Sequence, residues 1–179
     1  MKRIVGLAAF LSFIIPITAF CQDKSYYDVL NGKELTHGYD IGINTSGEQH
    51  GWLKGKGNEL VMTYPDNQDW GAAFITVGHA RHSQEERESR DYSTYDSLFI
   101  SMKGAKGGEK VDIGIKDKTN PDNGQETKKT VTLSNVYSQY AFALKDFITA
   151  DREHLYVVTE FVFGQNSPCK IFVNSVKFK

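Results

Sequence analysis

DSLFISMKGAKGGEKVDIGIKD, residues 96–117, contains two runs in which apolar and polar side chains alternate. A repeat of two residues is the pattern of a β-strand with one buried face and one outer face. The side chains expected on the inner faces are Leu98, Ile100, Met102, Val111, Ile113 and Ile115. Gly107 and Gly108 lie between the runs and favour a turn, so the two strands follow each other at the spacing of a hairpin.

The same alternation recurs along most of the chain, with turn-forming residues between the runs. Further strands are expected at 58–64, 70–77, 127–133, 137–144, 154–163 and 170–178, and the stretch 26–43 adds one or two. No long amphipathic helix interrupts these runs. Eight to ten strands without helices predict an all-β fold, an antiparallel sandwich or barrel.

Length and composition exclude several classes of protein. The chain has 179 residues, with 21 basic and 22 acidic side chains, and its formal net charge is -1. A near-neutral chain is a poor nucleic-acid binder, so no nucleic-acid partner is expected. Two cysteines are too few for a disulfide scaffold, and no nucleophile-elbow, phosphate-loop or H-E-x-x-H motif is present.

The N-terminal residues read as a targeting segment. Lys2 and Arg3 precede a short apolar run, which is typical of a secretory signal peptide and too short for a membrane span. We expect residues 1–21 to be removed and residues 22–179 to form a single domain. The protein is then exported to the periplasm, the cell surface or the medium. A lipoprotein anchored through Cys21 is the alternative.

The order and spacing of the later strands resemble the β-jelly-roll carbohydrate-binding modules, of galactose-binding-like type, that occur in secreted bacterial proteins. The stretches that carry the resemblance are 91–104, 107–117, 155–163 and 171–178. The resemblance implies a jelly-roll β-sandwich of eight to ten strands that binds a polysaccharide or oligosaccharide without catalysis. Many members of that group also hold a structural Ca²⁺ between the first and last strands. Asn174 matches the position in the last strand, where its neutral amide weakens a calcium site, and Asp28, Asn31 and Glu34 are the candidate oxygen ligands near the N-terminus.

Sugar binding requires aromatic faces that stack on a pyranose ring and polar groups that pair with its hydroxyls. Trp70 opens a predicted strand at a rim of the sandwich, although it could equally cap the core. Trp52 lies among glycines and could be exposed. The full set of expected ligand-binding residues is Trp70, Trp52, Tyr64, Asp112, Lys116, Tyr156 and Glu160, of which the last four alternate away from the core.

Two other functions remain open on the residues alone. A small secreted glycoside hydrolase or lyase needs two carboxylates facing each other across a cleft, for which Asp112 and Glu160 are the candidates. A domain that contacts other secreted proteins needs a large exposed apolar patch instead. Nothing in the sequence points specifically to catalysis, so binding is the favoured function.

Overall fold

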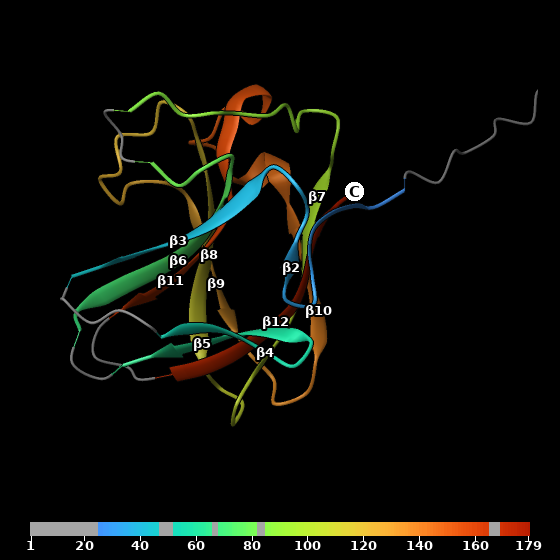
Figure 1. Cartoon of the computed structure of the whole chain (residues 1–179), viewed down its shortest axis with the longest axis vertical. Coiled ribbons are helices and arrows are strands. Elements are labelled where there is room, and N and C mark those ends of the chain that lie inside the picture. The colour runs from blue at the N-terminus through green and yellow to red at the C-terminus, as the bar shows by residue number, and fades with distance from the viewer. Residues whose placement is uncertain (1–24, 47–51, 66–67, 82–84, 165–168) are drawn as a thin grey trace, which may run out of the picture.

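The computed structural model describes residues 25–46, 52–65, 68–81, 85–164 and 169–179. Nearly every element in this part of the chain is a β-strand, and the strands form two antiparallel sheets (Figure 1). The expected all-β sandwich is therefore confirmed. The predicted signal peptide lies outside the described residues. Among the residues that are described, no helix is long and apolar enough to cross a membrane.

The first sheet has five strands in the order β3-β6-β11-β8-β9. Its strands are β3 (Tyr39–Thr45), β6 (Trp70–Val77), β11 (Leu155–Gly164), β8 (Lys110–Asp117) and β9 (Lys128–Thr132). The path of the second, seven-stranded sheet runs β10-β7-β12-β1-β2, and β5 pairs with both β12 and β4. Its strands are β10 (Ser138–Ala143), β7 (Ser97–Gly104), β12 (Cys169–Phe178), β1 (Tyr27–Asn31), β2 (Glu34–Leu35), β5 (Glu59–Tyr64) and β4 (Leu53–Lys56).

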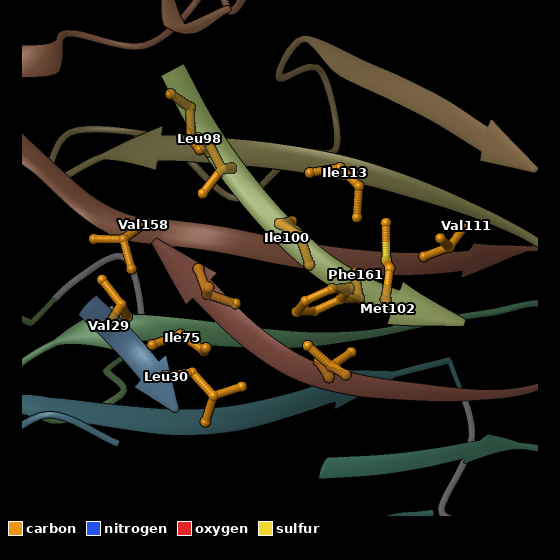
Figure 2. Packing of buried hydrophobic residues seen from close by; sticks show 14 of the residues in the cluster. Val29, Leu30, Ile75, Leu98, Ile100, Met102, Val111, Ile113, Val158 and Phe161 are labelled. Atoms are coloured by element: carbon orange, nitrogen blue, oxygen red, sulfur yellow. The ribbon is translucent and has the colours of Figure 1, made fainter. Parts of the chain in front are cut away.

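The core lies between the two sheets, where the inner faces interlock (Figure 2). Leu98, Ile100 and Met102 of β7 are fully buried, as the alternation predicts. Val111, Ile113 and Ile115 of β8 meet them from the other sheet. Removing these side chains from water is the main stabilising term, worth roughly 1.5–3 kcal/mol for each large aliphatic side chain.

The expected hairpin between β7 and β8 is wrong, because the two strands belong to different sheets. β7 pairs with β10 and β12, whereas β8 pairs with β11 and β9. The connection crosses from one sheet to the other at Gly107 and Gly108, whose φ angles of 86° and 90° are readily reached only by glycine. The short spacing correctly predicts a turn between the two strands. The strands enter different sheets, however, because their apolar faces are buried best when they pack against each other across the core.

Two features of the fold are not visible in the alternation of the sequence, namely two 3₁₀ turns and a cluster of tyrosine hydroxyls. Two 3₁₀ turns, η1 (Leu144–Asp146) and η2 (Arg152–His154), connect β10 to β11. The hydroxyls of Tyr27, Tyr39 and Tyr92 cluster beside the Arg90 guanidinium, which lies 5.0 Å from the Tyr39 ring centre. Burial raises the pKa of both Tyr39 and Tyr92, so these phenols stay neutral and join the N-terminal strand to the rest of the sandwich.

Candidate functional site

The outer face of the five-stranded sheet is hollowed by a groove of about 620 Å³, within the range of roughly 300–1,000 Å³ typical of small-ligand sites. Two of the residues that line it carry little side chain, Gly42 on β3 and Ala72 on β6, and Gly114 on β8 lies under the groove residue Glu160. The side chain of Phe74 lies over Gly42, and that of Glu160 lies over Gly114. A Cβ on Gly42 would come 2.5 Å from the Phe74 ring, and one on Gly114 would come 2.4 Å from Glu160 Oε1.

Trp70 is the first residue of β6 and lines the groove with an exposed aromatic side chain. It is 41% exposed, and Phe74 follows four residues later on the same side of β6. The Trp70 backbone is held by Ser46, whose amide donates to the Trp70 carbonyl at 3.0 Å and whose hydroxyl accepts from the Trp70 amide at 3.2 Å. The indole is therefore presented to solvent by a fixed backbone, which lowers the entropy cost of stacking a ligand on it.

Tyr156 and Arg87 line another part of the groove. The guanidinium of Arg87 lies 4.8 Å from the centre of the Tyr156 ring, and its Nη1 donates to the Asn120 carbonyl at 2.8 Å. Arg87 also forms an ion pair with Asp122. The Tyr156 hydroxyl meets the backbone of Arg81 and His79. These contacts draw the segment before β7 over the sheet, so both side chains are buried although they lie outside the core.

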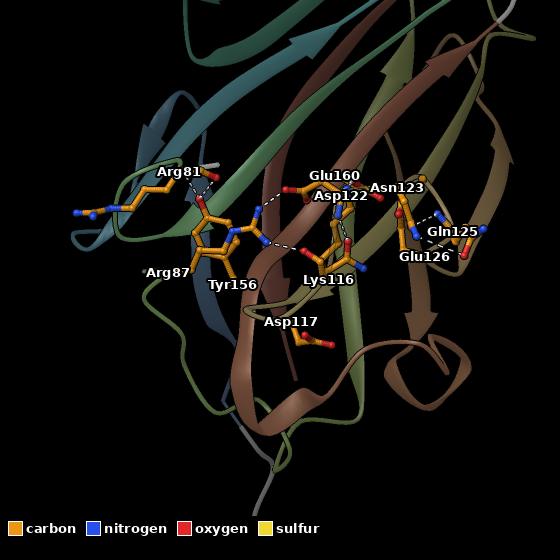
Figure 3. A network of polar contacts seen from close by, with 12 residues as sticks. Arg81, Arg87, Lys116, Asp117, Asp122, Asn123, Gln125, Glu126, Tyr156 and Glu160 are labelled. Carbon is orange, nitrogen blue, oxygen red and sulfur yellow. Dashed lines mark hydrogen bonds and ion pairs between the residues drawn. The ribbon is translucent and has the colours of Figure 1, made fainter. Parts of the chain in front are cut away.

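Lys116 is the centre of an ionic network on the groove floor (Figure 3). Its Nζ lies 3.1 Å from Glu160, 3.6 Å from Glu126 and 3.9 Å from Asp122. Lys128 Nζ lies 2.6 Å from Glu126. Because most of these side chains are nearly covered, their attractions are screened less than those of surface ion pairs.

Burial raises the pKa of Glu160 to about 7. The residue is only 1% exposed, and the neighbouring charge of Glu126 adds to the shift, while Lys116 opposes it. For Glu126 burial also acts upward, but the hydrogen bond from Lys128 and the charge of Lys116 outweigh it and lower its pKa. Both carboxyls share the Lys116 Nζ, and their opposite pKa shifts mean that Glu160 takes up a proton at a higher pH than Glu126 does.

The structure brings five of the seven predicted ligand-binding residues to this sheet face, and four of them line the groove. Lys116, Tyr156 and Glu160 line the groove with Trp70. Trp52 and Tyr64 are instead in the core, against Phe163, and Trp52 is only 6% exposed. The expectation that Trp52 is exposed is therefore corrected. The Trp52 indole packs between the two sheets, so a ligand can reach neither the Trp52 ring nor the Tyr64 ring.

Asp112 lies on the same sheet face, but it lines a different hollow from Glu160. Its Oδ1 accepts a hydrogen bond from Thr130 at 2.5 Å. The proposed hydrolase pair of Asp112 and Glu160 therefore does not face one shared cleft. Glu126 and Glu160 instead meet at the Lys116 Nζ, which lies 3.6 Å from the first and 3.1 Å from the second.

The residues expected to hold calcium lie on three strands of the seven-stranded sheet, Asp28 on β1, Glu34 on the edge strand β2 and Asn174 on the interior strand β12. Asp28 is paired with Lys177, whose Nζ lies 3.2 Å from Asp28 Oδ1. Glu34 pairs in register with Asn31, and the Asn174 carbonyl accepts from the Gly32 amide at 2.7 Å. The part of the chain that the structure describes has no group of three His, Cys, Asp or Glu placed to hold a metal ion. This arrangement fits a calcium site poorly, and the ion remains a prediction.

The sequence did not single out several residues that complete the groove. They are Asn44, Phe74, Arg81, Arg87, Glu126 and Lys128. Phe74 could have been found from strand alternation, since it shares the outer side of β6 with Trp70 and Ala72. Arg87 and Glu126 gave no such signal, because they lie in irregular segments whose course over the sheet depends on the whole fold.

No protein-family model matches the chain, and no curated protein matches it. Solved structures of family 29 carbohydrate-binding modules do resemble it. A variant of the module CBM29-2 superimposes with a TM-score of 0.58 at 16% identity, covering 87% of this chain and 92% of that one. Two other CBM29-2 variants, one complexed with cellohexaose and one with mannohexaose, give TM-scores of 0.56 and 0.57, each at 16% identity. They cover 86% of this chain and 89% and 90% of their own chains. The fold is thus the jelly-roll sandwich of carbohydrate-binding modules, as the strand order implied.

Proposed function

We propose that the protein is an exported, non-catalytic binder of a polysaccharide or oligosaccharide, and that the sugar chain lies in the groove of the five-stranded sheet. The observation that carries this proposal is the exposed Trp70 indole that lines a groove whose floor bears ordered polar side chains. An indole face stacks on the C–H face of a pyranose, and the polar groups orient its hydroxyls.

The dimensions of the groove favour a chain of sugars over a single one. Trp70 and Phe74 are four residues apart on one side of β6, which is about 13 Å at the usual rise of a strand. Lys116 and Lys128 offer donors on the strands across the sheet, and Asn44 offers both donor and acceptor. Several sugar units can therefore be contacted at once.

The structural neighbours support the choice of ligand to test first. CBM29-2 variants were obtained with cellohexaose and with mannohexaose, and other variants of it were made to probe ligand recognition. We therefore propose gluco- or manno-configured oligosaccharides as the class of ligand. Similarity of fold alone does not identify the sugar, because the same β-sandwich architecture serves other functions.

Isothermal titration calorimetry with cellohexaose and mannohexaose tests the proposal. We expect the wild-type protein to bind at least one of them and Trp70→Ala to lose affinity by about 1–3 kcal/mol, the cost of removing an aromatic anchor. Tyr137→Ala is the matched control, since Tyr137 is 40% exposed but lies beside the seven-stranded sheet, hydrogen-bonded to Glu59. Equal affinity losses in both variants, or none in Trp70→Ala, would remove the groove as the binding site.

A further inference from the structure

The acid pair of Glu126 and Glu160 is not needed to stack a sugar, yet it lies directly under the groove. Both side chains are nearly covered, with 3% and 2% of their side-chain surface exposed. Among the described residues, neither Glu160 Oε1 nor Glu126 Oε2 has a hydrogen-bond partner when both carboxyls are ionised. Two carboxylate oxygens cannot bond to each other, because both only accept.

A single proton is enough to supply the hydrogen bond that these two carboxyls lack. A proton on Glu160 turns its carboxyl into a donor, and the hydrogen bond between the two acids is then satisfied. Gly114 provides the space, because any side chain at that position would overlap Glu160 Oε1. The sheet therefore accommodates a neutral Glu160 under the groove, and this neutral form needs no further counter-ion.

Lys116 is the group through which the protonation state of Glu160 can affect a bound ligand. The charged groups around Glu160 are Lys116 from β8, Asp122 and Glu126 from the 118–127 connection, Lys128 from β9 and Arg87 from the segment before β7. Lys128 is committed to Glu126, and Arg87 to Asp122. Lys116 is shared among three acids and retains 14% side-chain exposure, so its hydrogen bonding changes most when Glu160 gains or loses charge.

We propose that Glu160 is a positioning residue of the glycan site. While Glu160 shares a proton with Glu126, Lys116 is free to donate to a sugar oxygen. Loss of that proton to solvent draws Lys116 onto two carboxylates and weakens glycan binding. The inference rests on the proposed function. It adds that affinity falls as pH rises through neutrality. A neutral Glu160 also leaves the groove with one negative charge fewer.

Calorimetric titration with the oligosaccharide that binds, at about pH 5.5 and about pH 8.5, tests the inference. We expect the association constant to fall about tenfold over this range, which corresponds to a change of one unit in the Glu160 pKa on binding. Glu160→Gln keeps a donor toward Glu126 and mimics the protonated form. It should bind at both pH values as tightly as the wild type does at the lower one.

Two further variants separate positioning from general structure. Glu59→Gln makes the same acid-to-amide change on the seven-stranded sheet and should keep the wild-type pH profile. Lys116→Met is made in the Glu160→Gln background, where the two remaining acids each keep another partner, Glu126 with Lys128 and Asp122 with Arg87, and it should weaken binding severalfold. An unchanged affinity there, or a Glu160→Gln variant that keeps the wild-type pH dependence, overturns the inference while leaving the groove proposal intact. Failure of every oligosaccharide to bind at either pH overturns both.

Discussion

Replacement of Glu160 by Gln should make the protein more stable above neutral pH. The pKa of Glu160 is about 7 in the folded protein, against an ordinary value of 4.5. A carboxyl whose pKa is raised by folding stabilises the native state below its ordinary value, and that stability is lost as pH rises through the folded value. At 1.36 kcal/mol per pKa unit, the interval of 2.5 units corresponds to about 3 kcal/mol.

The lowered pKa of Glu126 adds stability as pH rises toward its ordinary value of 4.5 and changes little above it, so the window above about pH 4.5 reports mainly Glu160. We therefore expect the wild-type free energy of unfolding to fall by about 1–3 kcal/mol between about pH 4.5 and about pH 8 from this pair. Gln cannot ionise, so the variant lacks the fall that Glu160 causes. The Gly114 cradle and the contact with Glu126 suit a neutral amide of the same shape.

Urea unfolding at a series of pH values measures the difference between the two proteins. The useful quantity is the variant free energy minus the wild-type value, which removes titrations common to both. It should rise with pH and level off above about pH 8, where Glu160 is ionised. A difference that stays constant from about pH 4.5 to about pH 8 would refute the raised pKa and the shared proton together.

Three other predictions follow from the same contacts. In Trp70→Phe the remaining indole, Trp52, is buried in the core, so acrylamide quenching of tryptophan fluorescence should fall sharply and addition of oligosaccharide should no longer change the emission. Gly114→Ala should destabilise the protein by about 1–3 kcal/mol through overpacking, whereas Gly164→Ala, with open space around its Cβ, should be close to neutral in thermal unfolding. If calcium binds at Asp28, adding it should raise the melting temperature and EDTA should reverse the rise; an unchanged melting temperature would remove the metal from the fold.

Local alternation was sufficient to place most strands. The predicted runs 70–77 and 110–117 coincide with β6 and β8, and the others differ from the observed strands by one or two residues at their ends. The described residues form twelve strands in place of the expected eight to ten, because the N-terminal stretch forms three and β4 was not expected. β4 escaped prediction since its sequence, Leu53–Lys56, contains a single apolar residue.

The candidate site was predictable only in part, and its two tryptophans show why. Trp70 and Trp52 both stand near glycines and turns, so their sequence surroundings are alike. In the structure Trp70 is on the outer side of β6, whereas Trp52 precedes β4 and turns inward between the sheets onto Phe163. The direction of a side chain outside a regular strand depends on the path of the backbone, which distant contacts set.

From the sequence alone came the β-class of the protein, the approximate strands and the side of each strand that faces the core. These follow from the two-residue repeat, a property of neighbouring residues. The pairing of strands, the separation of β7 from β8, the burial of Glu160 and its meeting with Glu126 came only from the folded chain. Each of them joins residues far apart in sequence, and the free energy that selects them comes from packing two whole sheets together and not from any local pattern.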